Sequence, residues 1–196
     1  MKKRILSLGV VVICLAILAS GTIAYFSAED TAHNVITTNG IGINIIEKTE
    51  SDGGVLTDFP EGGISGVMPG TSVSKIVSVE NDGGAEAWIR VQVEQEIQSA
   101  DEETLPLVLS GEIPVMTVTV DTSKWILEDG WYYYYKPVAA GAVTDILFEE
   151  VHFAPEMGNE YQNCTANIEI LAQAVQTANN GSTVMDAQGW PAEVTE

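Results

Sequence analysis

Short strand-like segments recur through most of the chain, from residue 34 to residue 175. Each is rich in β-branched or aromatic residues, and clusters of Gly, Pro, Asn and Asp separate them. This pattern is typical of a β-sandwich, and helical periodicity is absent beyond the first 24 residues. We therefore predict an all-β fold, a single antiparallel β-sandwich of the jelly-roll type over residues 36–178. The expected strands cover residues 34–46, 72–80, 87–97, 115–120, 125–127, 131–136, 143–153 and 164–175.

Two of the separating clusters are turn sequences that predict hairpins. Asn81-Asp82-Gly83-Gly84 stands between the second and third expected strands, and Asp129-Gly130 stands between the fifth and sixth. Both are short and rich in residues that accept positive φ, as hairpin turns require. Inside the first expected strand, Gly40 and Gly42 predict a bulge or a close approach of another backbone.

The sixth strand holds a run of five aromatic residues, residues 131–135. Because side chains alternate along a strand, Trp131, Tyr133 and Tyr135 face one way and Tyr132 and Tyr134 the other. We expect one set to pack in the core and the other to pair across strands, in preference to a sugar-binding surface.

The N-terminus has the organisation of an export signal. Met1-Lys2-Lys3-Arg4 is positively charged, residues 5–19 are almost entirely apolar, and small residues follow up to Ala24. This order predicts a signal peptide over residues 1–24, a helix that is removed by cleavage after Ala24. A retained membrane anchor is the alternative, because the apolar run approaches the length of a span.

Removal of the signal would leave a strongly acidic chain. The whole sequence carries 8 basic and 28 acidic residues, and three of the basic residues lie in the signal, so the remainder has a formal charge of −23. Such a charge repels phosphate backbones, which excludes nucleic acid as a partner. Cys164 is the one cysteine beyond the signal, so an intramolecular disulfide is impossible and a small buried side chain is expected there.

The segment after the signal, residues 25–35, is apolar and strand-prone. A strand with free main-chain groups is a ready template for pairing with another chain. We interpret this segment as the part that joins subunits into a fibre, with the rest of the chain providing the groove that receives it. Packing of the same segment onto its own domain is the alternative.

Three patches of the sequence have a distinctive composition and order. They are an aromatic pair after Gly-Thr followed by a Gly-led strand, a Pro-Gly turn with the strands around an Asn-Asp-Gly turn, and a last strand ending in Gln-Ala-Val-Gln. The patches lie at residues 21–27 with 39–43, at residues 68–71 with 79–91, and at residues 161–176. Together they resemble the TasA/camelysin family of exported bacterial proteins.

The resemblance implies a jelly-roll subunit of extracellular biofilm-matrix or cell-surface fibres of a Gram-positive bacterium, exported with a signal for a dedicated SipW-type signal peptidase. It implies that residues 25–35 add as a strand to the neighbouring subunit, head to tail. On this hypothesis Tyr25 and Phe26 are the anchoring side chains, and Ala28, Ala32 and Val35 are further candidates. The implied partners are copies of the chain, with a minor anchoring or accessory protein as a second candidate. The membrane is involved through the signal peptide before cleavage.

Two other functions remain open at this point. The first is a monomeric, surface-exposed binding or accessory module of the same fold. The second is a metallopeptidase, because camelysin-like proteins have been described as such. His33 and His152 are the two histidines, far apart in the sequence, and a His-Glu-x-x-His pair is missing. We therefore expect no catalytic residue, metal or cofactor, and we expect residues 179–196 to form a polar, flexible tail.

Overall fold

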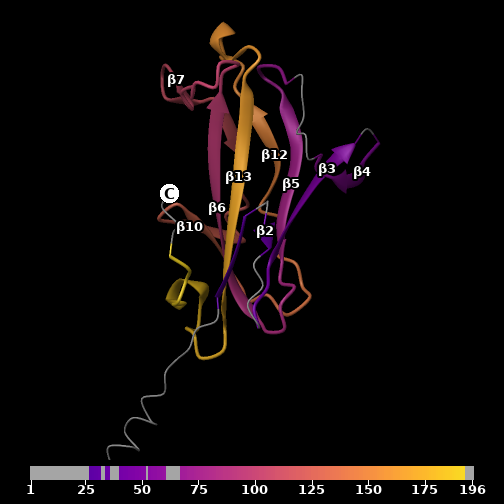
Figure 1. The fold of residues 1–196 in the computed structure, drawn as a ribbon, viewed down its shortest axis with the longest axis vertical. Coiled ribbons are helices and arrows are strands. Elements are labelled where there is room, and N and C mark those ends of the chain that lie inside the picture. The colour runs from indigo at the N-terminus through magenta and orange to yellow at the C-terminus, as the bar shows by residue number, and fades with distance from the viewer. Residues whose placement is uncertain (1–26, 32–33, 36–39, 52, 61–66, 193–196) are drawn as a thin grey trace, which may run out of the picture.

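The computed structural model describes residues 27–31, 34–35, 40–51, 53–60 and 67–192. Nearly all regular structure in these residues is antiparallel strand, arranged in two large sheets and one two-stranded sheet (Figure 1). The prediction of an all-β fold is confirmed. The expected signal peptide, with its cleavage site at Ala24, lies outside the described residues, as do Tyr25, Phe26 and Ala32.

The six-stranded sheet has the order β10-β11-β6-β13-β1-β2. At its centre, β6 and β13 pair along their whole length, from Ala87 opposite Gln176 to Gln98 opposite Thr165. The strands are β1 (Ser27–Thr31), β2 (Asn34–Val35), β6 (Ala87–Gln98), β10 (Trp125–Glu128), β11 (Trp131–Tyr134) and β13 (Thr165–Gln176).

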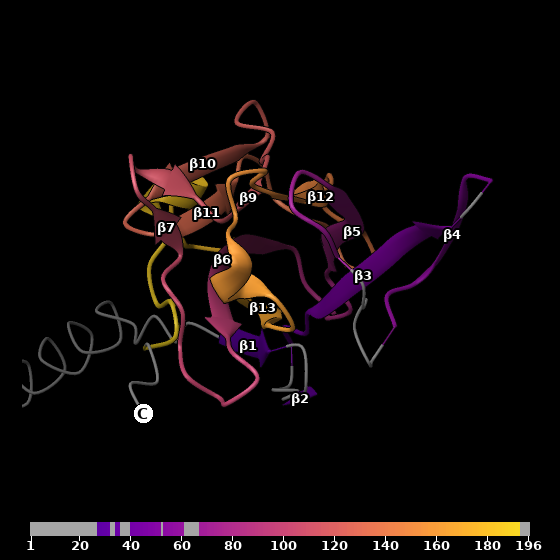
Figure 2. The ribbon, with the colours of Figure 1, turned by 90° about the horizontal axis from the view of Figure 1, so that it is seen from above.

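The five-stranded sheet has the order β4-β3-β5-β12-β9. Its β3–β4 hairpin extends away from the other strands (Figure 2). The strands are β3 (Asn44–Ser51), β4 (Val55–Asp58), β5 (Ser72–Glu80), β9 (Met116–Val118) and β12 (Phe148–Phe153). The small sheet pairs β7 (Val108–Leu109) with β8 (Ile113–Pro114), and two single 3-10 turns, η1 and η2, lie at Asn159–Tyr161 and Val184–Asp186.

One hydrophobic core lies between the two large sheets. Val77 and Val79 of β5 enter it from the five-stranded sheet, and Ile89 and Val91 of β6 enter it from the six-stranded sheet; all four are fully buried. Apolar residues recur at alternate positions in this part of both strands, so each strand presents one face to the core. The arrangement is that of a β-sandwich, and the jelly-roll topology stays a prediction.

Of the two predicted hairpins, one is confirmed and one is wrong. β10 and β11 pair around Asp129 and Gly130, whose φ angles of 49° and 82° suit a two-residue hairpin turn. In contrast, β5 and β6 belong to different sheets, and residues 81–86 cross between them. The β6 main chain pairs with β13 and β11 instead. Two strands that follow each other in the sequence can form a hairpin, but they can also lie in separate sheets and face each other across the core.

The crossing is fixed by a close contact between two glycines. Gly83 N donates to Gly42 O at 3.1 Å, and a Cβ atom on Gly83 would lie 2.4 Å from Gly42 N. Asn81, fully buried, donates from its side-chain amide to the carbonyls of Ala85 and Val138, both at 2.8 Å. The predicted close backbone approach at Gly42 is therefore confirmed.

The segment that follows β13 is not a flexible tail over its described part, residues 179–192. Val184 and Ala187 are buried against Trp88 and Val175 of the six-stranded sheet, in a second apolar cluster on the face away from the core. Trp88 Nε1 donates to the carbonyl of Asn180 at 3.0 Å. The prediction from polar composition is wrong because a few apolar side chains suffice to dock the segment on this outer face.

Candidate functional site

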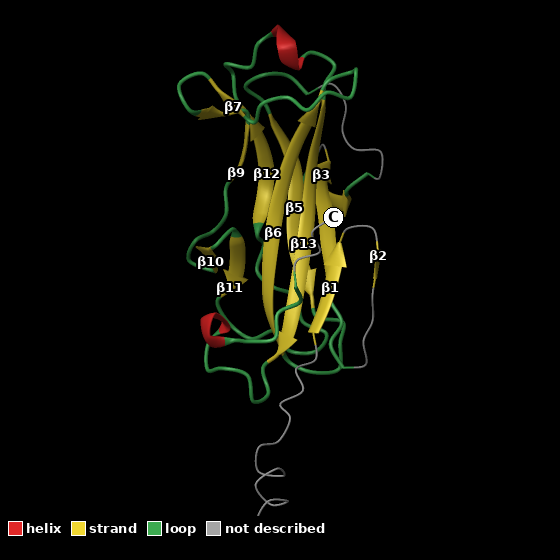
Figure 3. Ribbon diagram, turned by 60° about the vertical axis from the view of Figure 1, so that its left-hand side comes forward, coloured by secondary structure: helices red, strands yellow, loops and turns green. Residues whose placement is uncertain are grey.

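The candidate site is the edge of β13 on which the N-terminal strand lies. β1 runs antiparallel to β13, with Ser27 opposite Val175 and Thr31 opposite Leu171. β2 adds outside β1 through Asp30 opposite Val35. Figure 3 shows β1 beside β13, with β2 further out. The segment predicted to join subunits thus forms, as β1 and β2, the outer margin of this sheet in its own chain.

Two of the predicted assembly residues fall within this edge. Ala28 lies in β1 opposite Ala174, and Val35 lies in β2 opposite Asp30. Their register positions place both on the core-facing side of the sheet, because opposite residues of an antiparallel pair share a face and Ala174 belongs to the core. Tyr25, Phe26 and Ala32 are outside the described residues, so their role stays a prediction.

The opposite, outer face of the same sheet carries a polar cluster in which Gln173 is fully buried and Arg90 is half-buried. Arg90 of β6 lies opposite Gln173 of β13. Arg90 donates to Gln173 Oε1 from Nε at 2.9 Å and from Nη2 at 2.7 Å, and it donates from Nη1 to the Tyr133 hydroxyl at 3.1 Å. Both partners of the guanidinium, Gln173 and Tyr133, are uncharged.

Aromatic rings enclose the same guanidinium. Arg90 Cζ lies 4.0 Å from the ring centre of Trp131 and 4.7 Å from that of Trp190. Tyr133 meets Trp190 edge to face, with centres 5.9 Å apart. Trp190 therefore brings the C-terminal segment over Arg90, and a cation held between ring faces in this way is stabilised by the ring quadrupoles. The alternation predicted for residues 131–135 is confirmed, with Tyr132 and Tyr134 on the core side.

Gln173 is fully buried, yet its amide nitrogen has no hydrogen-bond partner among the described residues. A buried donor left without a partner costs about 1–3 kcal/mol. An acceptor within reach of Gln173 Nε2 would remove this cost. The outer face of this sheet thus contains the positive charge of Arg90 and, on the neighbouring strand β13, a buried donor.

A second polar cluster lies at the β11 end of the same sheet. The Tyr134 hydroxyl donates to Asp145 Oδ2 at 2.5 Å and accepts from the Asp145 amide at 3.0 Å. The hydrogen bond from Tyr134 lowers the pKa of Asp145 below its ordinary value of 3.8. Lys124 and Lys136 place their ammonium groups 5.0 and 5.1 Å from the ring centre of Tyr135. This cluster ties the loop after β11 to the sheet.

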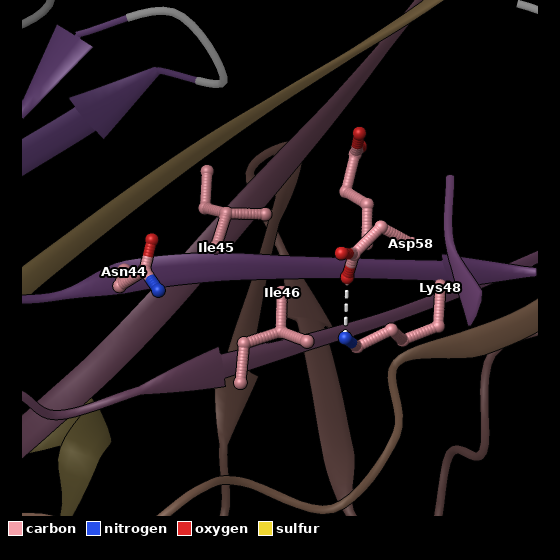
Figure 4. Close-up of a pocket in the computed structure, with 6 residues that line it drawn as sticks. Asn44, Ile45, Ile46, Lys48 and Asp58 are labelled. Atoms are coloured by element: carbon pink, nitrogen blue, oxygen red, sulfur yellow. Dashed lines mark hydrogen bonds and ion pairs between the residues drawn. The ribbon is translucent and has the colours of Figure 1, made fainter. Parts of the chain in front are cut away.

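Two further places on the molecule hold polar side chains. His152 lies with Nδ1 3.2 Å from Ser72 Oγ, and no three His, Cys, Asp or Glu side chains gather as a metal site within the described part of the chain. A hollow beside β3 and β4 is lined by Asn44, Ile45, Ile46, Glu47, Lys48 and Asp58. In this hollow Lys48 forms an ion pair with Asp58 (Figure 4). All of the lining residues belong to the β3–β4 hairpin.

Arg90, Gln173 and Trp190 are the residues that sequence reasoning missed. Arg90 and Gln173 interrupt apolar strands at alternate positions, which is also what a solvated outer face would show. Trp190 of the C-terminal segment lies over Arg90, and the polar composition of that segment does not predict its docking. The sequence signal that could have indicated this docking is Trp190, a large aromatic residue in a largely polar C-terminal segment.

Comparison with models of known protein families, with curated proteins and with solved structures finds no significant match for this chain. Among the residues that the structure describes, no helix is long and apolar enough to cross a membrane.

Proposed function

We propose that this protein is a secreted structural subunit of extracellular matrix or cell-surface fibres, with a jelly-roll body, that assembles head to tail by addition of its N-terminal strand to the neighbouring subunit. The observation that carries the proposal is the position of β1, which pairs with β13 near the margin of the six-stranded sheet, with the two-residue β2 outside it. A strand at the margin of a sheet can leave it and be replaced by the same strand of another copy.

Exchange of β1 conserves the main-chain hydrogen bonds. The five residue pairs between β1 and β13 form equally well within a chain or between two chains, because the two strands and their register are the same. Strand addition of this type obtains affinity from the main chain and register from alternating side chains. A contact in which each subunit gives β1 and receives β1 is heterologous, and it produces a filament when it does not close into a ring.

A monomeric binding or accessory module is the second candidate, and one observation favours it. In the described structure β1 already lies on the β13 of its own chain, so the edge that would receive a second copy is occupied. The two candidates therefore differ in whether β1 exchanges between chains at accessible concentrations.

Electron microscopy of negatively stained protein would distinguish them. We would compare residues 25–196 with residues 33–196 at rising concentration, and check folding of both by circular dichroism. The fibre proposal predicts filaments from the longer chain and folded monomers from the shorter one. Filaments from both would show that β1 is not the joining strand, and monomers from both would favour the binding module.

A peptide of residues 25–35 supplies a direct control. Added to the chain of residues 33–196, it should bind the vacated β13 edge and should block growth of filaments from the longer chain. A peptide with the same residues in scrambled order should do neither. Binding can be followed by fluorescence anisotropy of a labelled peptide.

A further inference from the structure

β4 is an exposed edge strand in a protruding hairpin. It pairs with β3 on one side and with no other strand in the described part of the chain, and the β3–β4 hairpin extends away from the other strands (Figure 2). Val55 and Leu56, two adjacent apolar residues of β4, are 60% and 58% exposed. The main-chain groups of such an edge are a template for pairing, and the exposed apolar side chains favour a partner that would cover them.

β10 is a second exposed edge with matching side chains. It ends the six-stranded sheet and, among the described strands, pairs with β11 alone. Ile126 and Leu127 are 42% and 58% exposed, so β10 presents an adjacent apolar pair in a strand of four residues, as β4 does. β4 and β10 lie on opposite sides of the molecule (Figure 2). The two edges therefore meet only between different copies of the chain.

The start of β10 is positively charged, although the chain as a whole is strongly acidic. The ammonium groups of Lys124 and Lys136 lie 5.0 and 5.1 Å from the ring centre of the exposed Tyr135. A hydrogen bond with Lys136 and the nearby charge of Lys124 lower the pKa of the Tyr135 hydroxyl below its ordinary value of 10.0. Lys136 lies 3.7 Å from Asp145, whereas Lys124 forms no ion pair within the residues that the structure describes.

The β3–β4 hairpin carries the complementary charge. Glu50 of β3 is exposed, and its carboxylate, like the ammonium of Lys124, has no ion pair with any described residue. Glu50 lies opposite Leu56, and opposite residues of an antiparallel pair share a face. An unpaired carboxylate and an exposed apolar side chain therefore lie on the same face of the hairpin.

We propose that the β4 edge of one copy of this chain docks on the β10 edge of a second copy, with the Glu50 carboxylate near the Lys124 ammonium. Main-chain hydrogen bonds between the edges supply affinity, and the opposite charges set the orientation. The docking strand and the receiving strand are different, so the contact is heterologous and can continue from copy to copy. It uses neither β1 nor the β13 edge, and it stands apart from the proposed function.

Disulfide cross-linking tests where the copies touch. In a Cys164→Ser background, the chain of residues 25–196 carrying Leu56→Cys is mixed with a tagged chain carrying Leu127→Cys, and diamide is added as oxidant. Docking raises the effective concentration of the two thiols, so the linked pair should form about tenfold faster than when Val108→Cys replaces Leu127→Cys. Val108 is an exposed residue of the small sheet, and equal rates at the two positions would overturn the proposal.

Sedimentation velocity at about 0.15 M salt tests the charges. Lys124→Glu and Glu50→Lys each bring like charges together, and each should weaken association about tenfold. A mixture of the two variants should regain association, because each variant then supplies the charge that the other lacks. Glu94→Lys is the matched control for Glu50→Lys, since Glu94 is an exposed residue of β6, between its neighbours β11 and β13, and it should not weaken association.

Three outcomes of the sedimentation experiment would each overturn the proposal. They are a natural chain that stays monomeric up to about 1 mM, a mixture that associates no better than its two components, and equal weakening by Glu94→Lys and Glu50→Lys. Filaments are scored separately by electron microscopy. Their absence, with the cross-link formed as expected, would count against the proposed function alone.

Discussion

At the scale of single residues, the sharpest constraint is the contact between Gly83 and Gly42. An added Cβ on Gly83 meets backbone atoms, 2.4 Å from Gly42 N and 2.9 Å from Ile41 Cα. These backbone atoms of Ile41 and Gly42 cannot move aside as the end of a flexible side chain can. The crossing between the two sheets therefore depends on the absence of a side chain at this position.

Gly83→Ala is expected to destabilise the fold by roughly 2–3 kcal/mol, the range typical of overpacking at a rigid site. Urea denaturation followed by tryptophan fluorescence would measure the loss. Gly84→Ala is the matched control, since a Cβ there would meet no atom within 4 Å, and its midpoint should stay close to that of the natural chain. Equal losses in the two variants would contradict the steric argument.

The contribution of Asp145 to the stability of the fold depends on pH. Its pKa in the folded state is lowered, chiefly by the Tyr134 hydrogen bond, so ionised Asp145 favours folding. This contribution is fully present above the unfolded pKa, near 3.8, and is lost as the pH falls through the lower folded value. The difference in urea midpoint between the natural chain and Asp145→Asn should accordingly shrink from pH 6 to pH 2.5. A difference that is independent of pH would contradict this assignment.

At the scale of elements, the C-terminal segment acts as a cover for the outer face of the six-stranded sheet. Trp190 contacts Tyr133 and Arg90, and Val184 and Ala187 pack on Trp88. These contacts cover part of Arg90, and they give the sheet a second apolar layer beyond the sandwich core.

Trp190→Ala is expected to loosen this cover and to lower stability by about 2 kcal/mol, through lost burial and the lost cation–π contact. Limited proteolysis should then cut near residues 178–189 faster than in the natural chain. Met185→Ala is a suitable control, because Met185 is an exposed residue of the same segment. Equal cleavage of the two variants would mean that Trp190 does not hold the segment.

Sequence patterns predicted the positions of the strands better than they predicted which strands pair with each other. The alternation of apolar residues gave β6, β13 and the β10–β11 hairpin, where Asp129 and Gly130 specify the turn. The pairing of β5 with β6 failed because the same alternation is compatible with one sheet or with two facing sheets. The surroundings of the Arg90–Gln173 pair could not be foreseen, since Trp190, which lies over Arg90, belongs to a C-terminal segment of largely polar composition.

At the scale of the whole molecule, charge sets the conditions for association. Beyond the expected signal the chain has a formal charge of −23, so two copies repel each other over a distance of about 10 Å at 0.1 M salt. Added salt shortens this distance. On the proposed function, association should therefore depend strongly on ionic strength.

We expect the lowest protein concentration that gives filaments to fall as sodium chloride rises from 20 to 300 mM, at pH 7. Light scattering and sedimentation would measure it. Sucrose at matched osmolality serves as a control, because it leaves charge screening unchanged. A threshold that does not change with salt would mean that repulsion between subunits does not limit assembly.

The pairing of β1 with β13 also affects the order in which strands can pair during synthesis. Synthesis proceeds from the N-terminus, and Thr31 at the end of β1 precedes Thr165 at the start of β13 by 134 residues. A newly made chain therefore presents β1 long before it possesses the strand on which β1 docks, and pairing of such distant segments is slow. During that interval, the β13 edges that exist belong to chains already complete.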